Sequence, residues 1–331
     1  MGLFQRTAAE LPETRPEQLA EIERLTSANR ERRDRERERR LVALRHAAGV
    51  RALGTGAGAP DYPEPDVAAL GPAGRLPGIA GADVTPELLR AGILRDGCLL
   101  VRGLVDRERA LALAAGIDAA FAERGRRRPG DGLYEEFEPE PGFDVQSVRP
   151  WIEEGGGVLA VDSPKLMFQM LELFGQAGIT RLVEGYLGEE PLLSAHKTTL
   201  RKAEPEVGGA WHQDGAFMGE VRALNLWLSL SRCGDAAPGL DLVPRRLDEI
   251  VVGHVEILDV AATRAKVEAA AGPAGIERPV FEPGDALFFD EMFLHQTGAD
   301  PSMPHPRFAV ESWFFGASAF PADYAPVAVG P

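Results

Sequence analysis

Apolar residues follow two different spacings along the chain, and the change falls near residue 190. Before it, apolar positions recur at helical spacing behind residues that cap helices: Thr85 and Asp106 each begin a predicted helix, and residues 163–187 are again helical. The short apolar run 97–105 is typical of a buried strand. Short apolar runs separated by turns then predict strands at 192–200, 210–214, 223–230, 240–243, 280–281, 286–289 and 307–314. We therefore expect a mainly β fold with flanking helices and a barrel or jelly-roll core.

The N-terminal segment is helical in composition but highly charged. Within residues 15–48, the stretch 29–40 contains no apolar residue, so no face of it is expected to join a core. We expect a solvated helical arm that lies on the surface or mediates self-association. Nucleic-acid binding is disfavoured because acidic residues interrupt the Arg run. Gly, Pro and Ala dominate up to residue 82 and predict a linker, which divides the chain into an arm with linker at 1–82 and a compact domain at 83–331.

A long irregular segment interrupts the compact domain at 124–160. It is Arg-rich, then acidic and aromatic, and ends in three consecutive glycines. Segments of this length without regular structure are typical of functional lids. Arg149 and Trp151, beside the glycines, are candidates to close over a substrate, and packing between lid and helix is an equal alternative.

Composition narrows the classes of partner. The 331 residues carry a formal net charge of −15, which argues against general binding to nucleic acid or to an anionic membrane. The two cysteines, Cys98 and Cys233, are too few for a disulfide framework, and Cys98 lies in an apolar run. No secretion signal or membrane span is evident. We expect a soluble cytoplasmic protein that acts on a small molecule, and the preference for Arg, Ala, Gly and Pro indicates a GC-rich bacterial genome.

The first candidate for chemistry is the segment Trp211-His212-Gln213-Asp214. In an extended backbone, residues 212 and 214 point to the same face, so an imidazole and a carboxylate can bind one metal side by side. A His-x-Asp triplet alone has little specificity, and a surface or hydrogen-bonded pair is the simpler interpretation.

His295 can supply a third ligand. It follows the tight turn Glu282-Pro283-Gly284-Asp285 and the apolar run 286–289. Two imidazoles and one carboxylate on one face of an octahedron leave three positions open, as non-haem Fe(II) oxygenases need for a cosubstrate and O2. Zinc prefers a tetrahedral site with fewer open positions.

Arg307 is the only Lys or Arg between His295 and the C-terminus. A cation in an apolar strand needs an anionic partner. The distal carboxylate of 2-oxoglutarate suits a guanidinium that donates two parallel hydrogen bonds, while the 2-oxo acid end chelates iron. The alternative partner is Glu311, four residues on and on the same strand face.

With these residues in place, the chain from about Thr85 to Phe315 resembles the phytanoyl-CoA dioxygenase family of Fe(II)/2-oxoglutarate oxygenases. The motifs that carry the resemblance are residues 211–215 (WHQDG), 224–230 (LNLWLSL), 238–244 (PGLDLVP) and Gly284-Asp285 leading to His295 and Arg307. The chain departs from the family at Pro244-Arg245-Arg246-Leu247, where many members have Pro-Gly-Ser-His. That element is largely structural in the family, so the departure concerns a surface or substrate loop.

The resemblance implies a double-stranded β-helix with helices on one side. It assigns His212, Asp214 and His295 to iron and Arg307 to 2-oxoglutarate, with Trp227 and Thr198 as further walls of the cosubstrate pocket. Asp214 stands where halogenases of similar fold carry a small residue, which favours hydroxylation over halogenation.

The sequence therefore predicts a dioxygenase that uses Fe(2+), 2-oxoglutarate and O2 to hydroxylate an unactivated C–H bond of a small molecule. Phe217 and Met218, near the proposed ligands, indicate a partly apolar substrate. Two alternatives stay open: a cupin-like metal enzyme that does not use 2-oxoglutarate, and a non-catalytic jelly-roll scaffold whose Arg-rich arm is the working surface.

Overall fold

The computed structural model describes residues 11–54, 60–72, 76–125, 133–219, 221–252 and 260–330. The helices are α1 (Arg15–Glu31), α2 (Arg35–Val50), α3 (Pro86–Asp96), α4 (Arg107–Arg124), α5 (Arg149–Glu154), α6 (Pro164–Gln176), α7 (Ile179–Leu187), α8 (Gly215–Met218) and α9 (Val260–Ala271). The strands are β1 (Gly78–Ala80), β2 (Cys98–Arg102), β3 (Gly157–Leu159), β4 (Pro191–Ala203), β5 (Ala223–Ser229), β6 (Gly239–Leu242), β7 (Ala286–Phe289), β8 (His295–Gly298), β9 (Arg307–Gly316) and β10 (Pro326–Ala328).

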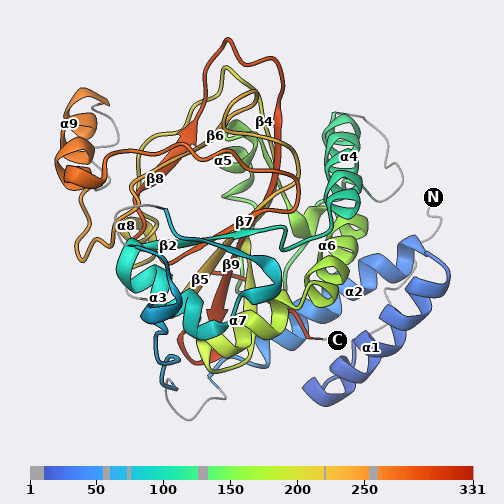
Figure 1. Ribbon diagram of the computed structural model, residues 1–331. Helices are drawn as coiled ribbons and strands as arrows, with labels where there is room; N and C mark the ends of the chain where they lie inside the picture. The colour runs from blue at the N-terminus through green and yellow to red at the C-terminus, as the bar shows by residue number, and fades with distance from the viewer. Residues whose placement is uncertain are drawn as a thin grey trace.

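The strands form one large sheet and one small one. The large sheet has the order β1-β2-β7-β5-β9-β4-β10, with β3 paired to β4, and its ladders are antiparallel except between β1 and β2. The small sheet pairs β6 with β8 in antiparallel register. Figure 1 shows the large sheet at the centre of the molecule, with β6 and β8 toward α9.

The two faces of the large sheet pack against different layers. Leu226 of β5 and Val310 of β9 belong to an apolar cluster shared with α3, α4, α6 and α7. Trp227 and Ala309, on the opposite face, cluster instead with Leu240 of β6. Helices contain more residues than strands, so the fold is mixed rather than mainly β. No helix in the described ranges combines the length and apolar character needed to cross a membrane.

Most of the predicted strands are confirmed. The errors occur where a segment is extended because it pairs with another strand, and not because of its own apolar pattern. The regions of β2, β4, β5, β6, β7 and β9 were expected within a few residues of their observed bounds. Residues 280–281 and 210–214 form only isolated bridges, at Phe281 and His212. The apolar pattern does not predict β8, because its sequence His-Gln-Thr-Gly is polar and its strand conformation depends on pairing with β6.

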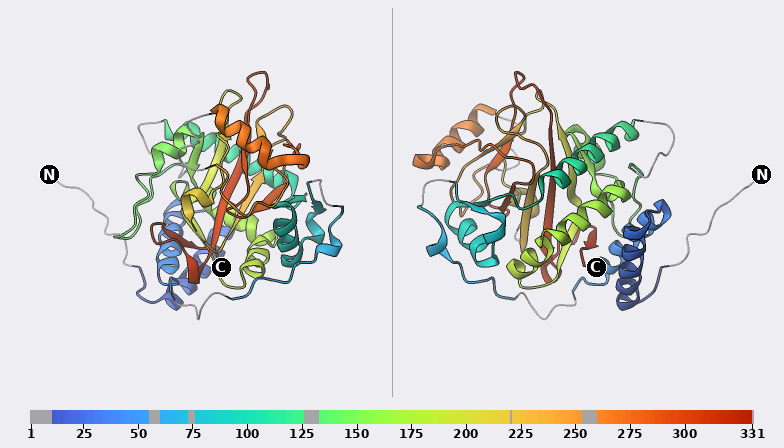
Figure 2. Two further views of the ribbon diagram at one scale, coloured as in Figure 1. Left: turned by 90° about the vertical axis from the view of Figure 1, so that its left-hand side faces the viewer. Right: turned by 45° about the vertical axis from the view of Figure 1, so that its right-hand side comes forward.

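The charged N-terminal segment is two packed helices, and the expectation of one solvated helix is wrong. α1 ends at Glu31, and α2 begins at Arg35 behind the N-cap Asp34. Asn29 and Glu38 lie in the stretch without apolar residues, yet both are buried and joined by a 3.4 Å hydrogen bond. Figure 2 shows the α1–α2 hairpin against the body of the molecule, at the end opposite α9.

Ion pairs to the rest of the domain replace the missing apolar contacts. Arg30 pairs with Glu172 of α6 at 2.5 Å, and Arg39 pairs with Glu135 at 2.7 Å. The apolar residues outside the charged stretch form a cluster with β4 and β10, which includes Ile22, Leu41, Leu44, Leu192 and Ala328. Helix periodicity alone cannot reveal partners that lie elsewhere in the chain. Self-association through this segment stays a prediction.

Arg45 fastens α2 to the C-terminal strand. Its buried guanidinium donates hydrogen bonds to the carbonyls of Ala328 at 3.1 Å and Gly330 at 2.5 Å. Burial lowers the pKa of Arg45 to about 10, so the group is still charged at neutral pH. The hairpin therefore contributes to the stability of the domain.

We expect Arg45→Met to lower the free energy of unfolding by about 2 kcal/mol, because two buried carbonyls lose a charged donor. Urea denaturation followed by circular dichroism measures this. Arg24→Met is the matched control: its side chain is 67% exposed, and removal of such a surface cation changes stability by less than about 0.5 kcal/mol. Equal effects of the two variants would show that the hydrogen bonds of Arg45 do not stabilise the domain.

Candidate metal centre

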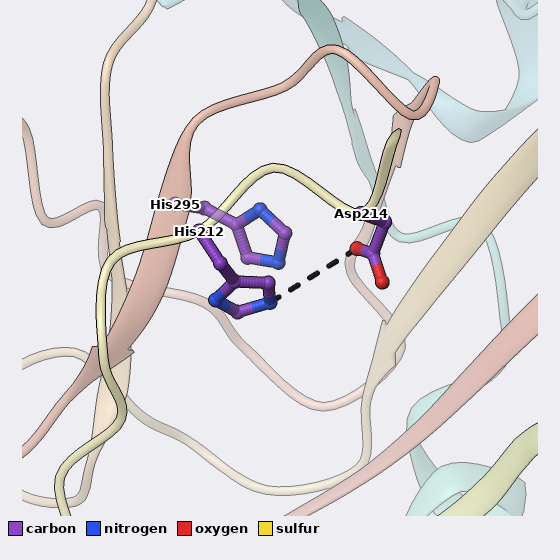
Figure 3. Close-up of side chains that lie close together, drawn as sticks. All are labelled: His212, Asp214 and His295. Atoms are coloured by element: carbon purple, nitrogen blue, oxygen red, sulfur yellow. Dashed lines mark ion pairs between the residues drawn. The ribbon is translucent and has the colours of Figure 1, made fainter. Parts of the chain in front are cut away.

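Three side chains that can bind a metal converge beside the small sheet. His212 precedes α8, Asp214 is the N-cap of α8, and His295 begins β8. One ligand atom from each lies within 4.8 Å of the other two. Figure 3 shows the imidazoles side by side, with Nε2 of His212 4.0 Å from Oδ2 of Asp214. The residues that the sequence singled out as a trio are thus brought together.

A β-bridge holds the two histidines opposite each other. The N–H of His212 donates to the carbonyl of His295 at 3.0 Å, and the N–H of His295 donates back at 3.1 Å. On its other side His295 pairs with Leu242 of β6. Residues directly opposite in an antiparallel pair present their side chains to the same face, so the bridge sets the spacing of the imidazoles, whose centroids are 4.4 Å apart.

Backbone carbonyls select the tautomer of each imidazole. Nδ1 of His212 lies 2.8 Å from the carbonyl oxygen of Ala210, and Nδ1 of His295 lies 3.0 Å from that of Phe293. Since a carbonyl can only accept, Nδ1 carries the proton and Nε2 keeps its lone pair for a metal. Burial and the neighbouring His212 lower the pKa of His295 to about 4, so this imidazole is neutral at neutral pH.

The segment between His212 and Asp214 is a turn, which corrects the expectation of a strand. Asp214 has helical dihedral angles of φ −60° and ψ −26°. The intervening Gln213 is fully buried. Its amide donates to the carbonyls of Glu249 at 3.0 Å and Met292 at 2.9 Å, and its Oε1 accepts from the N–H of Val251 at 2.7 Å. Three side-chain hydrogen bonds, rather than strand pleating, therefore make the two ligands converge.

Lys197 of β4 is a fourth side chain at this site, and the sequence analysis did not identify it. Its Nζ lies 3.3 Å from Oδ1 of Asp214, while Oδ2 is buried without a hydrogen-bond partner in the described part of the chain. Burial opposes ionisation of Asp214, but Lys197 and the two histidines hold its pKa below the ordinary value. Burial also opposes the charge on Lys197, and Asp214 raises that pKa above its usual value. A lysine within the predicted strand 192–200 was the available signal.

One face of the large sheet is turned toward the trio. The ring of Phe289 on β7 lies 4.8 Å from that of His295. Asn225 of β5 pairs with Phe289 and, on its other side, with Trp313 of β9. Because directly paired residues share a face, Asn225 and Trp313 line the same space. Trp227, two residues along β5, also points to this side.

Polar atoms on this face are buried without hydrogen-bond partners among the described residues. They are Thr199 Oγ1, Asn225 Oδ1 and Nδ2, Arg307 Nε and Trp313 Nε1. Thr199 shares the face because it pairs with Glu311, which in turn pairs with Trp227. Native proteins leave few buried polar groups unpaired, so the cluster indicates a ligand that supplies partners. Asn225 and Thr199 were missed, although a polar residue inside an apolar strand was a visible signal.

Arg307 begins β9, and no acidic side chain among the described residues pairs with it. It donates to the carbonyl of Gly239 at 2.8 Å, and its guanidinium carbon lies 5.5 Å from the ring centroid of Trp227. Burial lowers the pKa of Arg307 to about 10, which leaves it charged at neutral pH. The alternative ion pair with Glu311 does not form, because Glu311 accepts from Arg201 at 3.0 Å.

Thr198 faces the helices, which corrects its expected place in the pocket wall. It pairs with Ser312 of β9. Val310, two residues from Ser312, belongs to the apolar cluster under the helices. A bulge between Leu193 and Thr198 shifts the alternation of side chains, so Thr199 takes the inward position.

Arg149 and Trp151 form no hydrogen bond or ion pair with the trio in the described structure. Arg149 is buried and donates to Asp162 at 2.8 and 2.9 Å. Of the two alternatives given for it, packing within the protein therefore fits better than closing over a substrate. Trp151 is 72% exposed. Residues 126–132 of the expected lid lie outside the described residues.

Phe217 and Met218 lie in α8, the short helix that begins directly after Asp214. The ring centroid of Phe217 is 5.9 Å from Nζ of Lys197. Both side chains are only partly buried, which fits an apolar wall beside the trio.

We expect Gln213→Leu to lower the free energy of unfolding by about 2–3 kcal/mol, because two carbonyls and one N–H lose their partners. Chemical denaturation checks this. The control is Gln169→Leu, since Gln169 is exposed on α6 and its replacement is expected to change stability by less than about 0.5 kcal/mol. A Gln213→Leu protein as stable as the control would show that the turn holds without these bonds.

No family model matches the chain, and none of the curated proteins matches it. Among solved structures, it is similar to EctD from S. alaskensis with bound Fe: TM-score 0.51, 18% identity, 77% of this chain and 87% of that chain. It is also similar to the carbocyclase SnoK from nogalamycin biosynthesis, with TM-score 0.49, 17% identity, 72% of this chain and 86% of that chain. It is similar as well to the epimerase SnoN from the same biosynthesis, with TM-score 0.47, 19% identity, 72% of this chain and 86% of that chain. The likeness to EctD shows a shared fold.

Proposed function

We propose that this protein is an Fe(II)/2-oxoglutarate-dependent dioxygenase that hydroxylates an unactivated C–H bond of a small molecule. In this proposal the two sheets are the walls of a double-stranded β-helix. The observation that carries it is the trio of His212, Asp214 and His295 beside a sheet face that bears Arg307, which has no acidic partner among the described residues, and several buried polar atoms without a hydrogen-bond partner there. A candidate metal site and a buried cation on the same face of the sheet match this chemistry.

The donor set fits ferrous iron. Two neutral imidazole nitrogens and one carboxylate oxygen occupy one side of a metal and leave positions open on the other. Oδ2 of Asp214 is buried and has no hydrogen-bond partner among the described residues, and the contact of each Nδ1 with a carbonyl leaves Nε2 of both histidines for a metal. Bound iron, with 2-oxoglutarate and O2, would supply an oxidant strong enough to attack an unactivated C–H bond.

The residues around Arg307 fit a dicarboxylate. Its guanidinium is buried, charged and unpaired with any described acid, so an anion such as the distal carboxylate of 2-oxoglutarate would compensate it. Asn225 and Thr199 offer further donors on the same face. Trp227 packs over the guanidinium and, with Phe289 and Trp313, excludes water from this side.

The partly buried end of the site would hold the substrate. Phe217 and Met218 of α8 form its apolar side. Because they lie one helical turn after Asp214, a substrate that packs on them lies near the proposed metal.

The test is an anaerobic titration with Fe(II) followed by 2-oxoglutarate. We expect the weak visible charge-transfer band of the chelate in the wild type and no metal binding in Asp214→Ala. Arg307→Gln is expected to bind Fe(II) normally but 2-oxoglutarate about 100-fold more weakly, because a buried charged hydrogen-bond pair is lost.

Arg264→Gln is the control, since Arg264 is 72% exposed on α9. Iron binding without any response to 2-oxoglutarate would favour a cupin-like metal enzyme of another chemistry. Absence of iron binding in the wild type would favour a scaffold protein and refute the proposal.

A further inference from the structure

Lys197 places a cation with spare hydrogen-bonding capacity at the candidate metal centre. An ammonium has three donors, and Asp214 is its one acceptor within the described ranges, at 3.3 Å. The side chain is 25% exposed, and the remaining donors have no acceptor among the described residues. Nearby basic residues are already paired with acids: Arg201 with Glu311, and Lys202 with Asp118.

Two aromatic side chains lie near this ammonium. Phe217 lies on one side, with its ring centroid 5.9 Å from Nζ. Tyr324 lies close enough for Lys197 to influence the pKa of its phenol, although burial raises that pKa overall and keeps the phenol neutral. His196 fixes Tyr324 here by stacking on its ring at 5.2 Å and accepting the N–H of Ala325 at 3.1 Å. A cation near aromatic side chains suits a ligand with an apolar body and an anionic end.

The charge balance of the loaded site shows that Lys197 needs a further partner. Without a metal, Asp214 and Lys197 neutralise each other. If a divalent metal takes the carboxylate and the dianion 2-oxoglutarate is bound, the metal, the cosubstrate, Asp214, Lys197 and Arg307 leave one positive charge in excess. The pair of Arg201 and Glu311 does not change this balance. An uncompensated charge in a partly buried site is costly, and one negative charge on the substrate would compensate it.

We infer that Lys197 is a substrate-binding residue and that the substrate carries a carboxylate on an apolar body. This rests on the proposed function and names the substrate class of the same site. Metal binding to Asp214 weakens the hold of that carboxylate on Lys197, and the ammonium then becomes available to the substrate. The loaded site therefore selects acids over neutral analogues.

The experiment measures ligand binding to protein loaded with Mn(II) and saturating 2-oxoglutarate, so that no turnover occurs. The probes are a panel of aryl and alkyl monocarboxylates, such as 3-phenylpropionate and decanoate, each paired with its primary amide. We expect acids in the panel to bind wild type at least tenfold more tightly than their amides. Lys197→Met and Lys197→Gln should lose this preference while binding the amides unchanged.

Lys202→Met is the matched control, because Lys202 lies on the same strand with the same exposed fraction, 25%, and pairs with Asp118. It is expected to keep the preference for acids. No preference for acids in the wild type, or an equal preference in the Lys197 variants, would overturn the inference.

Two further measurements separate Lys197 from other roles. Mn(II) affinity is expected to be equal or tighter in Lys197→Met, because a cation that competes for Asp214 is removed. Weaker affinity would mean that Lys197 only positions Asp214 for the metal. The affinity for 2-oxoglutarate should change less than tenfold, and a larger loss would assign Lys197 to the cosubstrate. Failure of the proposed function itself is distinct, since the wild type would then bind neither Mn(II) nor 2-oxoglutarate.

Discussion

Two hydrogen bonds between the backbones of His212 and His295 set the geometry on which the candidate site depends. They join segments that lie far apart in the chain, and they continue the ladder that β8 forms with β6. A ligand carried on an unpaired loop would have to lose backbone entropy when a metal binds. The bridge provides that order in advance, and carbonyls on the same two segments direct each Nε2 to one point.

The elements that could be predicted from the sequence are those that form because they bury a pattern of apolar residues. β7 is a continuous apolar run and β5 is apolar at most positions, because the sheet is covered on both faces, by helices on one side and by the small sheet on the other. β8 has no such run, because its conformation comes from pairing with β6. The N-terminal hairpin was misread for a related reason: Asn29 and Glu38 are buried by polar contacts that helix periodicity cannot encode.

The sequence indicated the candidate metal-binding residues more reliably than the residues that line the site around them. His212, Asp214 and His295 are residue types with few structural uses in that combination, and Arg307 is the only Lys or Arg between His295 and the C-terminus. Which residues face inward depends on register, however, and a single bulge in β4 exchanges Thr198 for its neighbour. The fold shared with EctD fixes where strands lie, and not which side chain each strand turns inward.

The two cations of the site differ in burial, and this difference separates their roles. The guanidinium of Arg307 is enclosed, donates to one described carbonyl and leaves Nε unpaired, so its charge is tolerable only with an anion held at the same depth. Lys197 is compensated by Asp214 and keeps one side toward solvent. The deep cation therefore suits a cosubstrate that binds first and stays enclosed. The less buried Lys197 suits a ligand that enters afterwards from solvent, once the carboxylate of Asp214 binds the proposed metal instead.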